Sequence, residues 1–323
     1  MGLFDRLKEP VFLKDTSNAE QELAQLKELR DSAPDAIAEE INLRIRLVEA
    51  GIWGENTIRF ELTNSHIPMY VLHDSYLEHE GLSAKIDYLI ITRKGIFVLE
   101  CKNLLGNIEI NSSGEFIRTF SYGSRSKKEG IYSPITQNRR HLELIKQIRA
   151  AEQSNPLAKL MFERGFYQNY RSIVVLSNPK TLLNARYAKK EIRQQVIRAD
   201  QLAEHIRTVC ADPNLPSSND KSMEELAQFF LNIHKEQATD YTSPFREAIS
   251  AAQAKEPQPQ PQTPAPTPPP PAEPAPAEPE QVLCPKCGAP MVRRIASKGS
   301  NAGNAFYGCS KFPTCRCIVP IKS

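Results

Sequence analysis

Three charged side chains stand at the ends of two apolar stretches in KIDYLIITRKGIFVLECKN, residues 85–103 of the chain. Asp87 lies near the start of the first stretch, and Glu100 and Lys102 close the second. A two-residue turn at 93–94 would pair the stretches as antiparallel strands and set Asp87 opposite Glu100, with their Cβ atoms about 5 Å apart. Because side chains alternate along a strand, Lys102 shares the face of Glu100. The spacing therefore predicts a cluster of two carboxylates and one ammonium group.

Such a cluster is suited to metal-dependent chemistry. Two carboxylates this close repel each other unless a cation lies between them, and Mg²⁺ (or Mn²⁺) binds one or two carboxylates together with phosphate oxygens and water. A neighbouring lysine can orient a water molecule or stabilise phosphate charge. We interpret Asp87 and Glu100 as ligands of a metal site for phosphodiester hydrolysis. The alternative is a solvated sheet edge, and a turn shifted by one residue would separate the charges.

The end of the chain carries a second group of candidate ligands, built from cysteines. CPKCG supplies Cys284 and Cys287, and FYGCSKFPTC supplies Cys309 and Cys315. Two close pairs separated by the length of a hairpin fit a tetrahedral zinc site, and a segment of about 40 residues needs such a metal to fold. Cys317 is a fifth candidate that could replace Cys315. The alternative is a disordered tail with reactive thiols.

Charge is distributed unevenly along the 323 residues. The segment 281–323 has seven Lys or Arg residues and no Asp or Glu, whereas the rest of the chain has 34 basic and 38 acidic residues. A segment this one-sided predicts an anionic partner. Interleaved aromatic and basic side chains hold unpaired nucleic acid without sequence choice. We expect single-stranded DNA to contact Arg293, Arg294, Tyr307, Lys311, Phe312 and Arg316. The alternative is that the aromatic residues only pack the core of the segment.

The elements that position these residues follow from sequence periodicity. Residues 18–50 predict two helices, of which the second opens near Pro34 and ends at Gly51. In GENTIRFEL, Glu55 stands at the start of an apolar helical stripe. Strands are expected in MYVLHD, IDYLIIT and IFVLECK, followed by a weaker pair around GNIEI and EFIRTF.

The second half of this region predicts more helices and strands. A helix opened by Pro134 brings Gln137 and His141 to one face, although His141 alone equally fits a half-buried helical histidine. SIVVLS predicts a strand buried on both faces. A further strand, followed by a helix capped by Asp200, is predicted in QQVIRADQLAEHIRTV. The mixture indicates an α/β fold. We expect a helical segment at 1–50, the α/β domain at 51–251, a proline-rich linker at 252–281 and the zinc segment at 282–323.

The ordered motifs resemble the nuclease-related domain family, NERD. The resemblance rests on Gly54-Glu55, KIDYLIITRKGIFVLECKNLLG and YSPITQNRRH, over roughly residues 45–150. It implies a PD-(D/E)xK nuclease-like mixed sheet flanked by helices. It also implies that Asp87 and Glu100 bind the metal, with Lys102 as the catalytic lysine. The helical glutamate and the glutamine of the family match Glu55 and Gln137. Ile86 replaces the proline of the PD pair.

The cysteine segment resembles the zinc ribbon of bacterial type IA topoisomerases. CPKCG, FYGCSKFPTC and the arginine that follows carry this resemblance over residues 282–320. It implies zinc ligation by the four cysteines, with Cys315 favoured over Cys317. It also implies binding of single-stranded DNA, since the ribbons of those enzymes bind it.

These features predict a DNA-processing protein, a metal-dependent nuclease with a tethered ribbon that holds the substrate. Two alternatives stay open: a non-catalytic DNA-binding adaptor on a nuclease fold, and a zinc-stapled module for protein interactions. We expect a cytoplasmic protein without membrane contact, because the sequence has neither a long apolar run nor a secretory leader, and Arg6 breaks the myristoylation pattern.

Overall fold

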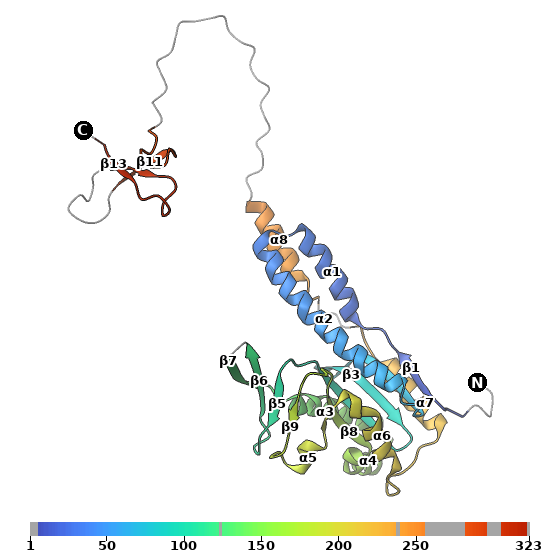
Figure 1. Cartoon of the computed structure of the whole chain (residues 1–323). Coiled ribbons are helices and arrows are strands. Elements are labelled where there is room, and N and C mark those ends of the chain that lie inside the picture. Colours follow the sequence, from blue (N-terminus) through green and yellow to red (C-terminus); the bar gives the residue numbers. More distant parts are fainter. Residues whose placement is uncertain (1–5, 123–124, 237–239, 256–281, 296–304, 322–323) are drawn as a thin grey trace, which may run out of the picture. The chain divides into compact units, whose positions relative to one another are not determined.

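The computed structural model describes residues 6–122, 125–236, 240–255, 282–295 and 305–321. The chain divides into two compact units, Met1–Gln258 and Pro259–Ser323 (Figure 1). Most of the predicted proline-rich linker lies outside the described residues. In the described ranges, no helix combines the length and the apolar composition that crossing a membrane requires.

A six-stranded mixed sheet forms the centre of the first unit. Its strands follow the order β1-β2-β3-β4-β8-β10, in which β2, β3 and β4 form an antiparallel meander and the pairs β1–β2, β4–β8 and β8–β10 are parallel. The mixed α/β class predicted from the sequence is confirmed. The strand bounds are β1 Pro10–Lys14, β2 Met69–His79, β3 Leu82–Thr92, β4 Gly95–Lys102, β8 Tyr170–Leu176 and β10 Val196–Arg198.

The turn between β3 and β4 has the predicted length. Thr92 pairs with Gly95 across it, and the ladder continues to the pair of Tyr88 and Leu99. Asp87 and Glu100 are the next two residues along these strands. The predicted register is therefore correct, and it brings both acids to the same end of the hairpin.

Helices cover both faces of this sheet. One face packs Leu89 and Val98 against α3, α4 and α7, and the other packs Tyr88 and Leu99 against α2 and α6. Alternating strand residues thus serve two separate cores, as the period of a strand requires. The helix bounds are α2 Asp35–Thr63, α3 Pro134–Ala151, α4 Pro156–Asn169, α6 Leu202–Ala211 and α7 Asp220–Ile233.

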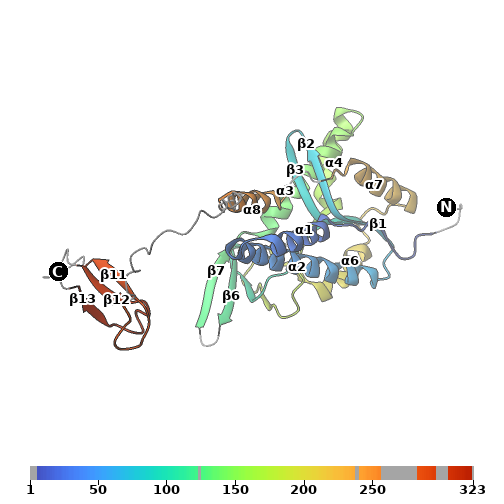
Figure 2. The ribbon, with the colours of Figure 1, turned by 90° about the horizontal axis from the view of Figure 1, so that it is seen from above.

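The predicted end of the second helix at Gly51 is wrong, because α2 continues through that residue to Thr63. Its first half packs against α1 (Asn18–Ser32) and α8 (Ser243–Lys255), through a cluster that includes Leu26, Ile45 and Ile249. The three helices lie side by side (Figures 1 and 2). Burial on both halves of α2 outweighs the weak helix propensity of one exposed glycine.

A smaller sheet follows β4 in the chain and has the order β7-β6-β5-β9. Its strands are β5 Asn107–Ile110, β6 Phe116–Tyr122, β7 Arg125–Ile131 and β9 Leu183–Asn184, and the short helix α5 spans Lys190–Arg193. Beyond β10, the predicted cap role of Asp200 is wrong. Asp200 lies inside a 3₁₀ turn, Ala199–Gln201, that leads directly into α6.

The second unit is a three-stranded antiparallel sheet with the order β11-β12-β13. The strands span Met291–Ile295, Ala305–Cys309 and Ile318–Pro320. Gly288 ends the CPKCG turn with φ +70, a backbone conformation that glycine adopts without steric cost. Its amide donates to the Cys284 carbonyl at 2.9 Å, which closes the turn around the first cysteine pair.

Candidate functional site

The acidic pair at the end of the β3–β4 hairpin is the first component of the site. Asp87 is half-buried, and its Oδ2 accepts a hydrogen bond of 2.7 Å from the backbone N–H of Cys101. Burial, the Glu100 carboxylate and the Glu55 carboxylate raise the pKa of Asp87 well above its usual range. The Glu55 and Glu100 carboxylates therefore lie close enough to oppose the ionisation of Asp87.

Glu100 is the most deeply buried member of this group, with 2% of its surface exposed. Lys102 Nζ donates to Glu100 Oε1 at 2.5 Å, as expected for residues that share a face of β4. Within the described residues, the other carboxylate oxygen, Oε2, is buried without a hydrogen-bond partner. Burial raises the pKa of Glu100, although Lys102 acts in the opposite direction. One lone-pair site of Glu100 is thus available for a further cation.

Gly54 lets α2 bring the third acid, Glu55, to this position. A Cβ atom at Gly54 would stand 2.7 Å from Ser177 Oγ and 2.9 Å from Asn103 Cβ, closer than real contacts allow. Only glycine therefore fits where α2 crosses the ends of β4 and β8. The next residue, Glu55, is half-buried.

His73 holds the Glu55 carboxylate in place. His73 Nε2 lies 2.9 Å from Glu55 Oε2, and the His73 ring stacks on Tyr88 with 4.5 Å between centroids. The Tyr88 hydroxyl in turn donates to the backbone carbonyl of Glu55 at 2.9 Å. His73 is a functional candidate that the sequence analysis missed. Its only signal was a histidine in a strand otherwise rich in buried apolar residues.

The helix α3 contributes His141 and Gln137 from the same side of the sheet as Glu100. His141 Nδ1 lies 3.6 Å from Glu100 Oε2, and burial together with the Lys102 charge lowers the pKa of His141 to about 4. At neutral pH His141 is therefore an uncharged neighbour of the acids. Gln137 is half-buried one turn earlier, and in the described part of the chain its side chain has no hydrogen-bond partner.

These acids fit a divalent cation. Burial and neighbouring carboxylates oppose the ionisation of Asp87 and Glu100, and among the described residues no group donates a hydrogen bond to Glu100 Oε2. A divalent ion supplies the positive charge that both observations call for, and carboxylate oxygens are ligands that Mg²⁺ and Mn²⁺ prefer. The residues that would hold it are Asp87 and Glu100.

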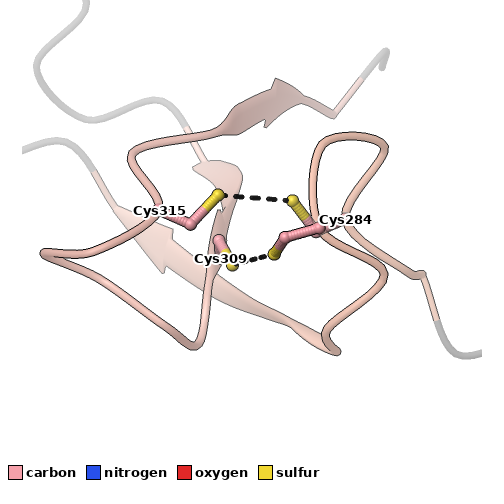
Figure 3. A group of neighbouring side chains, drawn as sticks. Cys284, Cys309 and Cys315 are labelled. Atoms are coloured by element: carbon pink, nitrogen blue, oxygen red, sulfur yellow. Dashed lines mark hydrogen bonds between the residues drawn. The ribbon is translucent and has the colours of Figure 1, made fainter.

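The four predicted cysteines come together in the second unit. Their sulfur atoms all lie within 4.8 Å of one another, with Cys284–Cys315 at 3.9 Å and Cys287–Cys309 at 3.4 Å. Cys284 and Cys315 come from loops and Cys309 from the end of β12, and their side chains converge (Figure 3). Sulfurs bound to Zn²⁺ at about 2.3 Å in a tetrahedron lie about 3.8 Å apart, so the group fits zinc. Cys317 contributes no sulfur to it.

Backbone amides favour the metal-binding form of one cysteine in this group, the Cys284 thiolate. Burial opposes ionisation of the Cys284 thiol, but hydrogen bonds from the amides of Lys286 and Cys287 lower its pKa to about 6. A thiolate is the form that binds Zn²⁺. In the described residues, no other set of three or more His, Cys, Asp or Glu side chains brings its ligand atoms as close together.

The predicted nucleic-acid residues are divided among three places on the ribbon. Arg293 pairs with Tyr307 on one sheet face, whereas Arg294 pairs with Phe306 on the other. The remaining predicted residues, Lys311, Phe312 and Arg316, are exposed in the loop between β12 and β13. Phe312 is 59% exposed, so it does not pack the core of the ribbon.

The comparison with protein families matches both units. Residues 50–177 match the nuclease-related domain, NERD. This range contains every predicted residue of the acidic site, from Glu55 to Gln137, together with His73 and His141. Residues 281–323 match the family described as topoisomerase DNA binding C4 zinc finger. The matched range contains the four-cysteine group. Both resemblances seen in the sequence are confirmed. Comparison with curated proteins and with solved structures gives no match.

Proposed function

We propose that this protein hydrolyses phosphodiester bonds of DNA with a divalent metal ion held by Asp87 and Glu100. The observation that carries the proposal is the buried Oε2 of Glu100, which accepts no hydrogen bond from the described residues and lies beside a second carboxylate of raised pKa. The match to the nuclease-related domain supports the same conclusion. Mg²⁺ or Mn²⁺ bound there would polarise a phosphoryl oxygen and lower the pKa of a bound water.

The surrounding side chains have separate roles in this proposal. Lys102 Nζ, which donates to Glu100, also stabilises negative charge on the phosphate, because it is partly exposed beside the acids. Glu55, oriented by His73, holds a proton or a water molecule at its carboxylate. Gln137 has an amide free to contact the substrate. His141 remains neutral and limits the access of water to Glu100.

The second part of the proposal is that the ribbon holds single-stranded DNA near the nuclease unit, in the cytoplasm. The supporting observations are the family match of the ribbon and the absence of Asp and Glu from residues 281–323. Tyr307 beside Arg293 offers an aromatic ring with an adjacent cation, which suits stacking of an unpaired base.

A cleavage assay tests the first part. Wild-type protein incubated with Mg²⁺ or Mn²⁺ should cleave single-stranded, duplex or branched DNA, and omission of the metal should stop the reaction. If the protein binds DNA but cleaves no substrate with either metal, it is a non-catalytic DNA-binding adaptor and not a nuclease. A protein that neither binds nor cleaves DNA would favour a protein-interaction module.

A substitution in the ribbon tests the second part. Tyr307→Ala should weaken binding of a single-stranded oligonucleotide by about 1–3 kcal/mol if a base stacks on the ring. Ile318→Ala is the matched control, because Ile318 is exposed on the opposite sheet face. Equal affinities of the two variants in a fluorescence anisotropy titration would refute stacking at Tyr307.

A further inference from the structure

The β6–β7 hairpin and the start of α3 carry a local excess of positive charge. Residues 116–140 contain six Lys or Arg and one acidic residue, whereas the rest of the sequence before residue 281 contains 28 basic and 37 acidic residues. A basic element on a unit whose net charge is close to zero attracts a polyanion locally and not through the net charge of the unit. The acidic site described above does not use these cations.

The hairpin stands at the periphery of the first unit. Among the described strands, β7 pairs only with β6 and forms the edge of the four-stranded sheet. Figures 1 and 2 both place β6 and β7 at the outside of the unit, and Figure 2 shows the two strands projecting away from the helices. The hairpin is therefore accessible to a large partner from more than one side.

Cations are presented on both faces of this two-stranded ribbon. Lys127 lies opposite Phe120 on one face, and Lys128 lies opposite Thr119 on the other. Phe120 is flanked by Lys127 and by Arg118, whose charged groups lie 5.8 Å and 5.2 Å from the centre of its ring. The ring thereby helps to hold two cations on one face.

Three of these cations are exposed and available for a partner. Arg125 and Lys128 form no ion pair within the described residues, and Lys127 is largely exposed although it lies 3.3 Å from Glu129. Arg118, in contrast, forms an ion pair with Glu129 and is half-buried. The free positive charge thus lies along β7.

The chain connects this hairpin directly to the acidic site. The hairpin follows β4, which ends at Lys102, and precedes α3, which carries His141 beside Glu100. Between them, Arg140 of α3 lies over the exposed Tyr132 ring at 5.8 Å. A polyanion bound along β7 would therefore continue past basic residues at the start of α3.

We propose that the β6–β7 hairpin binds duplex DNA by entering its major groove. That groove accommodates a two-stranded β-ribbon, and cations on both faces of the ribbon would contact the phosphates of both flanking strands. This inference rests on the proposed function and specifies its substrate. With duplex bound at the hairpin and an unpaired strand bound at the zinc ribbon, the preferred substrate is DNA with a junction between duplex and single strand.

The test is a binding titration with the full chain, without added divalent metal, so that cleavage does not enter. The triple variant Arg125→Gln, Lys127→Gln, Lys128→Gln is compared with Lys159→Gln, Arg164→Gln, Lys189→Gln, which removes the same charge from exposed positions elsewhere on the unit. The probes are a blunt duplex of 20 base pairs, the same duplex with a single-stranded extension, and the extension alone.

The hairpin variant should bind the blunt duplex more weakly than the control. The slope of log K against log salt concentration should fall by up to about 3, since each lost phosphate contact removes about 0.9. Its affinity for the single strand alone should match the control. Equal duplex affinity and slope in the two variants would overturn the inference and leave the cations as protection of a sheet edge. Wild-type protein that binds only single strands would also overturn it, while leaving the proposed hydrolysis standing.

Discussion

At the scale of single residues, the fold holds carboxylates of the site close together although their like charges repel. Asp87 and Glu100 lie on neighbouring strands, and Glu55 reaches them from a helix. In the metal-free chain, burial and repulsion disfavour the charged forms of Asp87 and Glu100. Charge concentrated in this way lowers the free energy of unfolding, and a bound cation raises it again.

Substitution of Asp87 tests this balance without any assay of catalysis. Asp87→Asn keeps an oxygen that accepts the Cys101 amide but removes one negative charge. Without metal, the variant should unfold at the same temperature as wild type or higher. Addition of Mn²⁺ should raise the melting temperature of the wild type and leave that of the variant unchanged, as followed by circular dichroism. An equal metal-induced shift in both proteins would show that Asp87 is no ligand.

At the scale of elements, α2 contains one glycine that packs closely against neighbouring residues and another that faces open space. Gly54 faces Ser177 and Asn103 at distances that exclude a side chain, whereas a Cβ atom at Gly51 would meet nothing within 4 Å. The position of Glu55 therefore depends on the close approach at Gly54.

The two glycines form a matched pair for mutation. Gly54→Ala should destabilise the protein by about 1–3 kcal/mol through overpacking, and Gly51→Ala should stabilise it by about 0.5–1 kcal/mol through helix propensity. Urea unfolding followed by circular dichroism measures both changes. Stabilisation by Gly54→Ala would contradict the packing described here.

The elements also show what could be predicted from the sequence. The β3–β4 register followed from one short turn and the alternation of apolar residues, so Asp87, Glu100 and Lys102 were placed correctly. The contact of His73 with Glu55 could not be predicted, because it depends on how α2 crosses the sheet. The backbone of the next residue, Asp74, has φ +52 and interrupts the pairing of β2 with β3, and the sequence pattern of the strand does not reveal this. The continuation of α2 through Gly51 likewise depends on tertiary packing.

At the scale of the whole molecule, the two units carry separate chemistry. The four-cysteine group draws all its ligands from the second unit, and the acids all lie in the first. Loss of zinc should therefore unfold the ribbon and leave the nuclease-related domain folded.

Two cysteine substitutions test this independence. Cys284→Ser should release zinc, because it removes a ligand, whereas Cys317→Ser should retain about one zinc ion per chain. Metal analysis gives the zinc content, and the melting temperature of the first unit should be the same in both variants. Zinc loss on substitution of Cys317, or none on substitution of Cys284, would reassign the ligands.

In the proposed function, the acids at the end of the β3–β4 hairpin catalyse metal-dependent cleavage. The most direct measurement compares wild type, Asp87→Asn, Glu100→Gln, Lys102→Ala and the exposed control Glu28→Gln in one Mg²⁺ and Mn²⁺ titration on labelled DNA. Wild type and the control should cleave at equal rates. The Asp87, Glu100 and Lys102 variants should show no cleavage above background while still binding the DNA through the ribbon. Cleavage by the Asp87 and Glu100 variants at the wild-type rate would show that these carboxylates do not catalyse the reaction.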